Sequence, residues 1–378
     1  MHFIIARSEL TELVRTVYDI VAPKTPVPLL SNFLLEAKDS RITLTATDLT
    51  VSVRTSGSAK VLQEGSTTLP ARRFAQLVRE LASAQVEIST SDKHMTRVVA
   101  DSSVFRIPGL AGNEFPTLPD CSDALTISFT QANLKDALYR TQFAVSTEDS
   151  RYALTGVFCQ ISRKSVIFIG TDGRRMARFC LPVDVDVEQG VECIIPSKAI
   201  GEMIKCLTKD DERCTLHVMP DKIGLSANDT FIVSKLLAGD YPDVDRIIPE
   251  QSSHVVQLHR EELMMLLRQI VLFTTDEWQS ARFTFTTGDL CLNATASNVG
   301  EGKVNMPVNY TGERFDIAFN PVYFLDALRH SKNETVSLGF TDPFNAGLVV
   351  DGPLQPIHKE LPHQLFVLMP LRLAEEVQ

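Results

Sequence analysis

Apolar residues recur at steps of three and four positions in six segments of the chain, which fall into two sets. The first set comprises residues 6–21, 130–145 and 259–273, and the second comprises residues 69–81, 195–207 and 319–331. Within the first segment, Leu10, Leu13 and Val17 fall on one helical face. This spacing predicts six amphipathic helices that each bury one face.

The segments between these helices alternate apolar and polar residues with the period of a β-strand. In residues 41–56, Ile42, Leu44 and Ala46 fall on one face, and the intervening threonines fall on the other. Each third of the chain reads as a strand, a helix and three strands, followed by the same series again. We therefore predict an α+β fold with two helices and about eight strands in each third.

Four sets of matching residues recur along the chain at a nearly constant spacing of about 126 residues. They are Leu10, Leu134 and Leu263; Pro70, Pro196 and Pro321; Phe105 and Phe231; and Pro116 and Pro242. Their spacings lie between 124 and 129 residues, and 126 is one third of 378. We therefore predict three tandem, similar domains, with boundaries in the polar stretches at 119–124 and 248–254.

The most unusual local pattern is the Thr-Asp-Gly break at residues 171–173, inside an otherwise strand-like segment. Asp48 occupies the equivalent place 124 residues before Asp172, and Ser297-Asn298 occupies it in the last third. A feature of the repeat is better explained by a turn, in which Asp or Asn bonds its own backbone, than by catalysis.

The distribution of charge separates the helices from the rest of the chain. The net charge is −10 and the pI is about 5.4, which argues against a protein that binds nucleic acid with its whole surface. The helical windows 7–21, 71–81, 131–145, 197–209, 260–272 and 320–332 nevertheless carry +5 together, so the remainder carries −15. Two interpretations stay open: ordinary solvated helix faces, or one basic surface shared by the helices and facing a polyanion.

No arrangement of residues makes a convincing active site. The histidines lack zinc-site spacing, residues 184–190 lack the ligand pattern of an EF-hand loop, and no P-loop, nucleophile-elbow or Rossmann glycine pattern occurs. We therefore predict no catalytic residue, metal or cofactor. The alternative is an enzyme acting on a phosphorylated substrate, with Asp172 as base and Arg174 and Arg175 binding the anion.

Three features of the sequence indicate in which compartment of the cell the protein works. No apolar run approaches the 18 or so residues of a membrane helix, and residues 1–7 read as a strand rather than a signal peptide. The seven cysteines are spaced singly, which favours reduced thiols. These features predict a cytoplasmic protein without a membrane partner.

With these motifs assembled, the whole chain resembles the bacterial sliding clamp family, the β subunits of the replicative DNA polymerase. The resemblance rests on PVPLLSNFLLEA (26–37), LTATDL (44–49), NEFPTLP (113–119), RYALTGV (151–157), TDGRRMA (171–177), DYPDVDRIIP (240–249) and VLMPLRL (367–373). The weaker alternative is a scaffold that is built from the same repeats and does not bind DNA.

The resemblance implies a DNA clamp fold in which each domain packs two helices on antiparallel sheets. The implied domains are residues 1–120, 126–247 and 254–373, followed by a short tail at 374–378. Two chains would join head to tail into a ring that encircles duplex DNA without reading its sequence. The clamp would tether the replicative polymerase, the clamp loader and other proteins through a peptide-binding pocket, conferring processivity without doing chemistry.

Three sets of site residues follow from matching the family motifs to this chain. The peptide-binding pocket would comprise Arg151, Tyr152, Leu154, Thr171, Gly173, Arg174, Arg175, Met176, Pro242, Arg246, Ile247, Asn320, Tyr323, Val367, Met369, Pro370, Leu371 and Arg372. The DNA-facing set would comprise Lys24, Arg72, Arg73, Lys135, Arg140, Lys198, Lys205, Arg268, Arg329 and Lys332. The dimer interface would bring Phe105 and Ile107 of one chain against Leu272 and Phe273 of the other.

The chain departs from the family pattern in three places. Many clamps have His where this chain has Arg174, many end at the position of Leu373, and the stretch 353–364 is long for the family. The first of these departures concerns the charge at the edge of the pocket, and the other two lengthen the chain around its last strand.

Overall fold

The three thirds of the chain repeat one order of helices and strands. The computed structural model describes residues 1–21, 25–119, 121, 123–275, 279–354 and 363–372. In the middle and last thirds of this described chain, a strand, a helix, three strands, a further strand, a second helix and three more strands follow one another, as predicted. The first third differs by one additional short strand, β5 (Lys60–Gln63).

Each predicted helix is present, with ends a few residues inside the predicted segments. The helices are α1 (Arg7–Tyr18), α2 (Ala71–Glu80), α3 (Gln131–Gln142), α4 (Ser197–Cys206), α5 (Arg260–Val271) and α6 (Pro321–Arg329). Leu10, Leu13 and Val17 of α1 are buried, which confirms the predicted face. Pro70 caps α2 and Pro321 begins α6, where proline does not interrupt helical hydrogen bonding.

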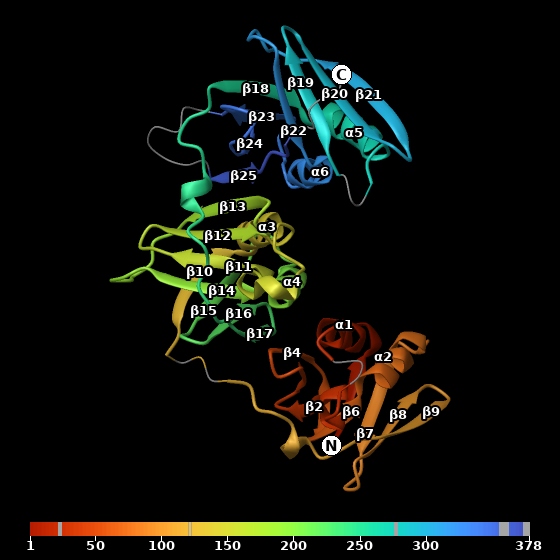
Figure 1. The fold of residues 1–378 in the computed structure, drawn as a ribbon. Coiled ribbons are helices and arrows are strands. Elements are labelled where there is room, and N and C mark those ends of the chain that lie inside the picture. Colours follow the sequence, from red (N-terminus) through yellow and green to blue (C-terminus); the bar gives the residue numbers. More distant parts are fainter. Residues whose placement is uncertain (22–24, 120, 122, 276–278, 355–362, 373–378) are drawn as a thin grey trace. The chain divides into compact units, whose positions relative to one another are not determined.

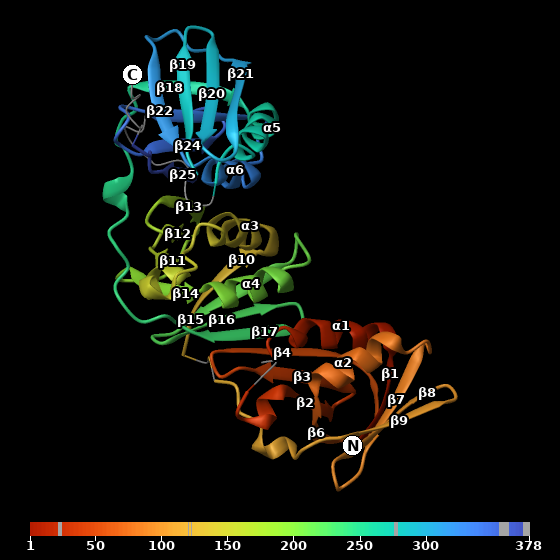
Figure 2. The same cartoon turned by 45° about the vertical axis from the view of Figure 1, so that its right-hand side comes forward.

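The described chain divides into two compact units, and the first comprises Met1–Lys135 and Lys198–Leu236. Its smaller sheet has the strand order β5, β1 (His2–Ala6), β7 (Gln85–Thr90), β8 (Met95–Ala100) and β9 (Ser103–Pro108). Its larger sheet has the order β10 (Leu125–Thr130), β15 (Arg213–Val218), β16 (Lys222–Ala227), β17 (Thr230–Lys235), β4 (Val51–Ser58), β3 (Arg41–Thr47), β2 (Asn32–Lys38) and β6 (Gly65–Pro70). Helices α1 and α2 lie side by side against this larger sheet (Figures 1 and 2).

The second unit comprises Asp136–Ser197 and Leu237–Gln378. Its larger sheet has the order β14 (Val191–Pro196), β11 (Gly156–Ile161), β12 (Ser165–Thr171), β13 (Arg175–Pro182), β25 (Gln364–Leu368), β24 (Gly347–Asp351), β23 (Thr335–Phe340) and β18 (His254–His259). Its smaller sheet, called sheet D below, has the order β21 (Gly300–Pro307), β20 (Asp289–Ala296), β19 (Ala281–Thr286) and β22 (Phe315–Phe319). Every pair of the strands named above is antiparallel, as the family resemblance implies.

Two units rather than three arise because strands of the middle third join sheets of both neighbours. Strand β17 pairs with β4 of the first third, and β13 pairs with β25 of the last third. Backbone hydrogen bonding therefore continues across the sequence boundaries between repeats. The exact limits 1–120, 126–247 and 254–373 stay a prediction.

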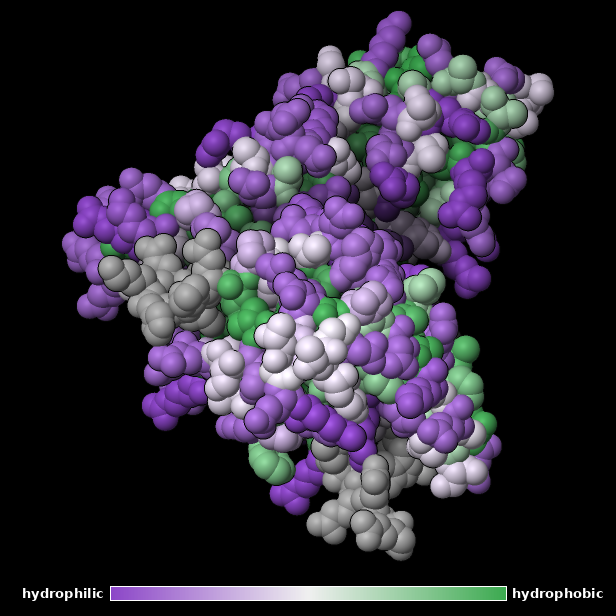
Figure 3. Space-filling view, turned by 90° about the horizontal axis from the view of Figure 1, so that it is seen from above, coloured by the Kyte–Doolittle hydropathy of each residue, from purple (hydrophilic) through white to green (hydrophobic). Residues whose placement is uncertain are grey.

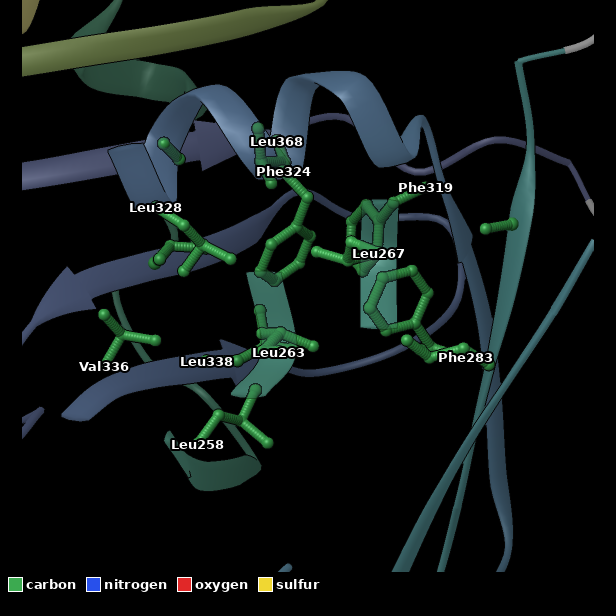
Figure 4. Packing of buried hydrophobic residues seen from close by; sticks show 14 of the residues in the cluster. Leu258, Leu263, Leu267, Phe283, Phe319, Phe324, Leu328, Val336, Leu338 and Leu368 are labelled. Carbon is green, nitrogen blue, oxygen red and sulfur yellow. The ribbon is translucent and has the colours of Figure 1, made fainter. Parts of the chain in front are cut away.

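The core of the second unit shows how the repeat buries its apolar positions. Leu263 and Leu267 of α5 and Phe324 of α6 point between the two sheets, where they meet Phe283 and Phe319 (Figure 4). The Phe283 and Phe324 rings stack with their centroids 5.2 Å apart. Aromatic contacts of this kind add about 1 kcal/mol each to the stabilisation from burial.

The face drawn in Figure 3 is mostly hydrophilic, with small hydrophobic groups. No helix in the described ranges is both long and apolar enough to cross a membrane. The same ranges contain no cluster of three or more His, Cys, Asp or Glu side chains placed to hold a metal.

Candidate functional site

A groove with a volume of about 1810 Å³ lies in the second unit. One end is formed by the turn after β12, the start of α6 and the segment after β25, and the groove continues over sheet D. Eight of its lining residues belong to the predicted pocket: Gly173, Arg174, Asn320, Tyr323, Met369, Pro370, Leu371 and Arg372. Segments almost 200 residues apart in the sequence thus contribute to one site.

The first wall of the groove is the tight turn at residues 171–175. Asp172 Oδ1 accepts hydrogen bonds from the backbone N–H groups of Arg174 (2.9 Å) and Arg175 (3.0 Å). Thr171 Oγ1 accepts from Gly173 N and donates to the Arg175 carbonyl. Gly173 has φ +82°, in the left-handed region that favours glycine. These bonds confirm the predicted turn, and Asp48 closes its counterpart by accepting from the N–H groups of Thr50 and Val51.

Arg175 holds this wall in place. Its guanidinium contacts Asp172 Oδ2 at 3.1 Å and Asp326 Oδ2 of α6 at 2.6 Å, and donates to the Phe143 carbonyl at 3.1 Å. It also lies over the Tyr323 ring, 4.5 Å from the centroid. With its side chain 12% exposed and its donors engaged, Arg175 positions the turn rather than reaching a partner.

Arg174, the residue before Arg175 in the turn, lines the groove. Hydrogen bonding by the Tyr323 side chain raises the pKa of the Arg174 guanidinium. Arg174 and Tyr323 both line the groove, so this pair joins the turn to the first turn of α6. A histidine here would be neutral over much of the physiological pH range, whereas Arg174 keeps a permanent positive charge.

The second wall is the segment that follows β25. Strand β25 pairs with β13 in a register that puts Val367 opposite Met176, and the backbone N–H of Met369 then donates to the Arg174 carbonyl (3.0 Å). Leu371 N–H donates to the Ala318 carbonyl of β22 (2.8 Å). These bonds fix the backbone while the side chains of Met369 and Leu371 stay 39% and 37% exposed. An apolar, adaptable surface is thereby held rigidly in the groove.

The remaining predicted pocket residues lie outside the groove lining. They are Arg151, Tyr152, Leu154, Thr171, Arg175, Met176, Pro242, Arg246, Ile247 and Val367. Met176 and Val367 are buried in an apolar cluster beneath the wall. Arg151 supports the turn by donating from Nη1 to the Asp172 carbonyl at 2.5 Å, and Tyr152 is 56% exposed.

Sequence reasoning missed the part of the groove that sheet D contributes. Arg282, Thr284 and Thr286 of β19 line it, as do several residues of β20 and alternate residues of β21. Alternation in residues 281–286 could have predicted an outward polar face, but not that this face adjoins the pocket. Gln279 was also missed; its side chain accepts a hydrogen bond from Asn320 Nδ2 at 2.9 Å.

Most of the predicted DNA-facing cations lie on exposed helix surfaces. Arg72 and Arg73 of α2 and Arg268 of α5 are exposed, and Lys135 of α3 is half-buried. Lys198 and Lys205 of α4 contact Asp48 at 2.5 Å and Asp19 at 2.7 Å. Arg329 and Lys332 contact Asp326 at 3.0 Å and Asp136 at 2.9 Å. Lys24 lies outside the described residues.

Arg140 does not fit the DNA-facing set, and we remove it. Its side chain is buried, with Nε 2.8 Å from Asp136 Oδ1 and Nη1 3.3 Å from Asp351 Oδ2. An arginine held by two carboxylates cannot reach a phosphate without leaving them uncompensated. It links α3 to the end of β24.

The predicted dimer contacts lie on β9, an edge strand, and beside β21, another edge strand. Phe105 of β9 is 38% exposed, whereas Ile107 is only 3% exposed within the single chain. Leu272 is 71% exposed, while Phe273 packs closely against Gly302 of β21. Of the four predicted dimer residues, Phe105 and Leu272 therefore expose the most apolar surface that another chain could bury.

His330, at the end of α6, forms a stack of rings with α3. Its ring lies 4.0 Å from Phe143 and 4.6 Å from Tyr139 between centroids, and Nδ1–H donates to the Asp326 carbonyl. Burial lowers the pKa of His330, assisted by Arg140 and Arg175 and opposed by Asp326. The neutral imidazole is the form that fits this site.

We expect the second unit to lose stability as the pH falls below about 6.5, the ordinary pKa of histidine. A lowered folded-state pKa means that the unfolded chain binds the proton first, so stability rises with pH through this window and falls with acidification. His330→Phe keeps the stack and removes the titration. The fall in melting temperature between pH 7.5 and pH 5.5 should be smaller in this variant, and equal falls would contradict the assignment.

The comparisons with known proteins agree along the whole chain. Models for the N-terminal, central and C-terminal domains of the DNA polymerase III beta subunit match residues 1–119, 128–243 and 245–361. A beta sliding clamp from Chlamydia muridarum is 43% identical over 376 residues, covering 100% of both chains. One from Vibrio cholerae is 27% identical, covering 99% of this chain and 100% of its own.

Solved structures give the same result. A crystal structure of a sliding clamp (DNA polymerase III subunit beta) from Pseudomonas aeruginosa, bound to griselimycin, superposes with a TM-score of 0.93. It is 27% identical to this chain and covers 99% of this chain and 100% of its own. Fold, length and domain order therefore all match.

Proposed function

This chain belongs to the DNA polymerase III beta subunit family and is a DNA sliding clamp. We propose which of its surfaces binds DNA, which binds partner proteins and which joins two chains. Two chains close into a ring, helix surfaces face the enclosed duplex, and the groove of the second unit binds partner peptides. The observation that carries the proposal is the joining of the 171–175 turn and the segment after β25 into one groove. The exposed Met369 and Leu371 side chains of that groove suit an apolar peptide anchor.

The ring forms from two chains joined head to tail, and the sheet edges support this arrangement. Strand β9 ends one sheet in the first third, and β21 ends sheet D in the last third. Unpaired strand edges invite pairing with another chain. Two copies of one β9-to-β21 contact, related by a twofold axis, would close the ring and leave neither edge free.

DNA is held by topology, so the helix surfaces need only modest positive charge. Many tight phosphate contacts would give binding a steep salt dependence and would resist sliding. Several cations of the DNA-facing set are already shared with carboxylates, as Lys198 is with Asp48 and Lys205 with Asp19. Such pairs reduce the electrostatic attraction between these lysines and DNA phosphates. Arg72 and Arg73, by contrast, are exposed on α2.

The groove tethers the replicative polymerase, the clamp loader and other proteins through their clamp-binding peptides. Its rigid backbone walls lower the entropic cost of binding, because the site is held before the peptide arrives. The exposed thioether and leucine side chains can adapt to different apolar anchors. One groove can therefore serve several partners in turn.

The clamp performs no chemistry itself, in this proposal, and works in the cytoplasm. The alternative of an enzyme using Asp172 as base lacks support, because that carboxylate closes the turn and contacts Arg175. The single spacing of the seven cysteines in the sequence favours a reducing compartment.

Neutralising the exposed arginines of α2 should weaken the attraction to DNA without affecting assembly. For Arg72→Gln with Arg73→Gln, we expect weaker binding of linear duplex DNA at low salt and a shallower salt dependence. Each lost phosphate contact should reduce the log–log slope by about 0.9. Fluorescence anisotropy across a salt series measures both effects.

The matched control neutralises two exposed cations on the turn between β11 and β12, Arg163→Gln with Lys164→Gln. This control should bind DNA as the wild type does. Equal losses in both double variants would mean that α2 has no special place in DNA binding.

A further inference from the structure

The groove extends well beyond the space that a short apolar anchor fills. Its volume of about 1810 Å³ exceeds the roughly 300–1,000 Å³ of ordinary ligand pockets. The additional length runs over the outer face of sheet D, where polar side chains from β19, β20 and β21 line the groove. This polar extension has no role in the proposed anchoring of a peptide.

The register of sheet D connects the anchor site to this extension. Leu371 forms an isolated bridge to Ala318, and Ala318 lies opposite Arg282. Arg282 in turn lies opposite Asn293, and Asn293 lies opposite Lys303. Side chains directly opposite one another in a sheet share a face, so one row runs from the apolar wall to Lys303.

The carboxylates on this face of sheet D accept hydrogen bonds from neighbouring side chains, whereas its lysine has no carboxylate partner among the described residues. Asn305 Nδ2 donates to Asp289 (2.6 Å), and Asn293 Nδ2 donates to Glu301 (2.8 Å). Lys303 is exposed at the far end of the row, and among the described residues it takes part in none of the salt bridges. Each of these carboxylates accepts a hydrogen bond within the sheet. The Lys303 side chain lies on the groove face of β21, not along the backbone edge that the proposed ring pairs with β9, so its ammonium group can meet an incoming anion.

We propose that the groove binds a longer partner segment than the apolar anchor alone, and that Lys303 receives an acidic residue of that segment. The occupant is the stretch of partner chain that flanks the anchor, lying extended across sheet D. This inference rests on the proposed peptide-binding function. It adds a second, electrostatic determinant of partner choice to the first, apolar one.

The geometry sets where the acidic residue must lie. Four strand-to-strand steps of about 4.8 Å separate the Leu371 position from Lys303, or about 19 Å. An extended chain advances about 3.3 Å per residue, so the acidic residue lies about six residues from the anchor. An isolated polyanion such as nucleic acid fits less well, because Asp289 and Glu301 line the same surface.

The test compares peptides of two lengths on the intact chain. One fluorescent peptide carries the clamp-binding segment of the cognate polymerase alone. Others add six residues at either end, with aspartates, lysines or serines at the last two positions. Affinities are measured by fluorescence polarisation on the wild type, on Lys303→Glu and Lys303→Gln, and on Lys93→Glu, which alters an exposed lysine on the β7–β8 turn.

We expect aspartates at one end to tighten binding about threefold, the size of an exposed ion pair. That gain should vanish in both Lys303 variants and in 0.5 M salt, and persist in Lys93→Glu, with the short peptide bound equally throughout. The inference is overturned if neither end gives a gain or if the gain survives in the Lys303 variants. A Lys303-dependent affinity for single-stranded oligonucleotide without any peptide gain would also overturn it, in favour of nucleic acid.

Failure of the proposed function has a different signature. If the short peptide itself does not bind the wild type, the groove is not a peptide site and the inference falls with it. Normal binding of the short peptide without an effect of the extension overturns only the role of Lys303.

Discussion

A chain carrying Met369→Ala and Leu371→Ala should lose most of its affinity for a polymerase-derived peptide and still fold and assemble. Both side chains are more than a third exposed in the groove, so truncating them costs the fold little. Buried anchors at the centre of an interface contribute about 2 kcal/mol or more each, and 2 kcal/mol corresponds to about 30-fold in affinity. Fluorescence polarisation with a labelled peptide measures the loss.

Two further variants damage the same site in other ways. Deleting residues 369–378 removes the second wall and should abolish binding. Gly173→Val should weaken binding through the first wall, because Gly173 has φ +82° and a Cβ would lie 2.8 Å from Arg151 Nη1. If the deletion variant binds peptide as well as the intact chain, the two-walled groove is not the binding site.

Leu272→Asp should convert the proposed dimer into folded monomers. The Leu272 side chain is 71% exposed in the single chain, so an aspartate there is solvated in the monomer. In an apolar interface the same carboxylate would be buried without a partner, at a cost of several kcal/mol. Leu272 is the better target than Phe273, whose ring contacts Gly302, because replacing Phe273 would also disturb the core.

Sedimentation velocity distinguishes the two states directly. Phe344→Asp serves as control, since Phe344 is 77% exposed on the β23–β24 turn of the same unit. It should sediment as the wild type does. A Leu272→Asp protein that stays dimeric would remove Leu272 from the interface.

The sequence predicted those parts of the structure that depend only on residues close together in the chain, namely the helices and the turn at Asp172. The six helices follow from apolar spacing, and the turn at Asp172 follows from a side chain that bonds the two backbone N–H groups next to it. The repeat then extended each local prediction to the other thirds. Neither step required knowledge of distant contacts.

Features that depend on distant partners could not be predicted in this way. Arg140 was placed among the DNA-facing cations by matching the family motifs, and its predicted helix suggested an exposed side chain. Asp351, 211 residues away, supplies the second carboxylate that keeps the guanidinium in the interior. The pairing of Lys198 with Asp48 likewise joins elements 150 residues apart.

The groove illustrates the same division. Its apolar end was identified through motifs that resemble a known family, whereas its extension over sheet D was not. Alternation marks Thr284 and Lys303 as outward-facing, and most such positions in an antiparallel sheet are simply solvated. Only the register from Leu371 through Ala318 to Arg282 and Lys303 shows that this face adjoins the pocket.

Retention on circular DNA tests the central claim most directly. The ring is loaded onto nicked circular duplex by its clamp loader, the complex is isolated by gel filtration, and the DNA is then cut once. A topologically linked ring should stay on the circle through a high-salt wash and leave after linearisation. Equal retention before and after the cut would contradict encirclement and indicate binding to the DNA surface instead.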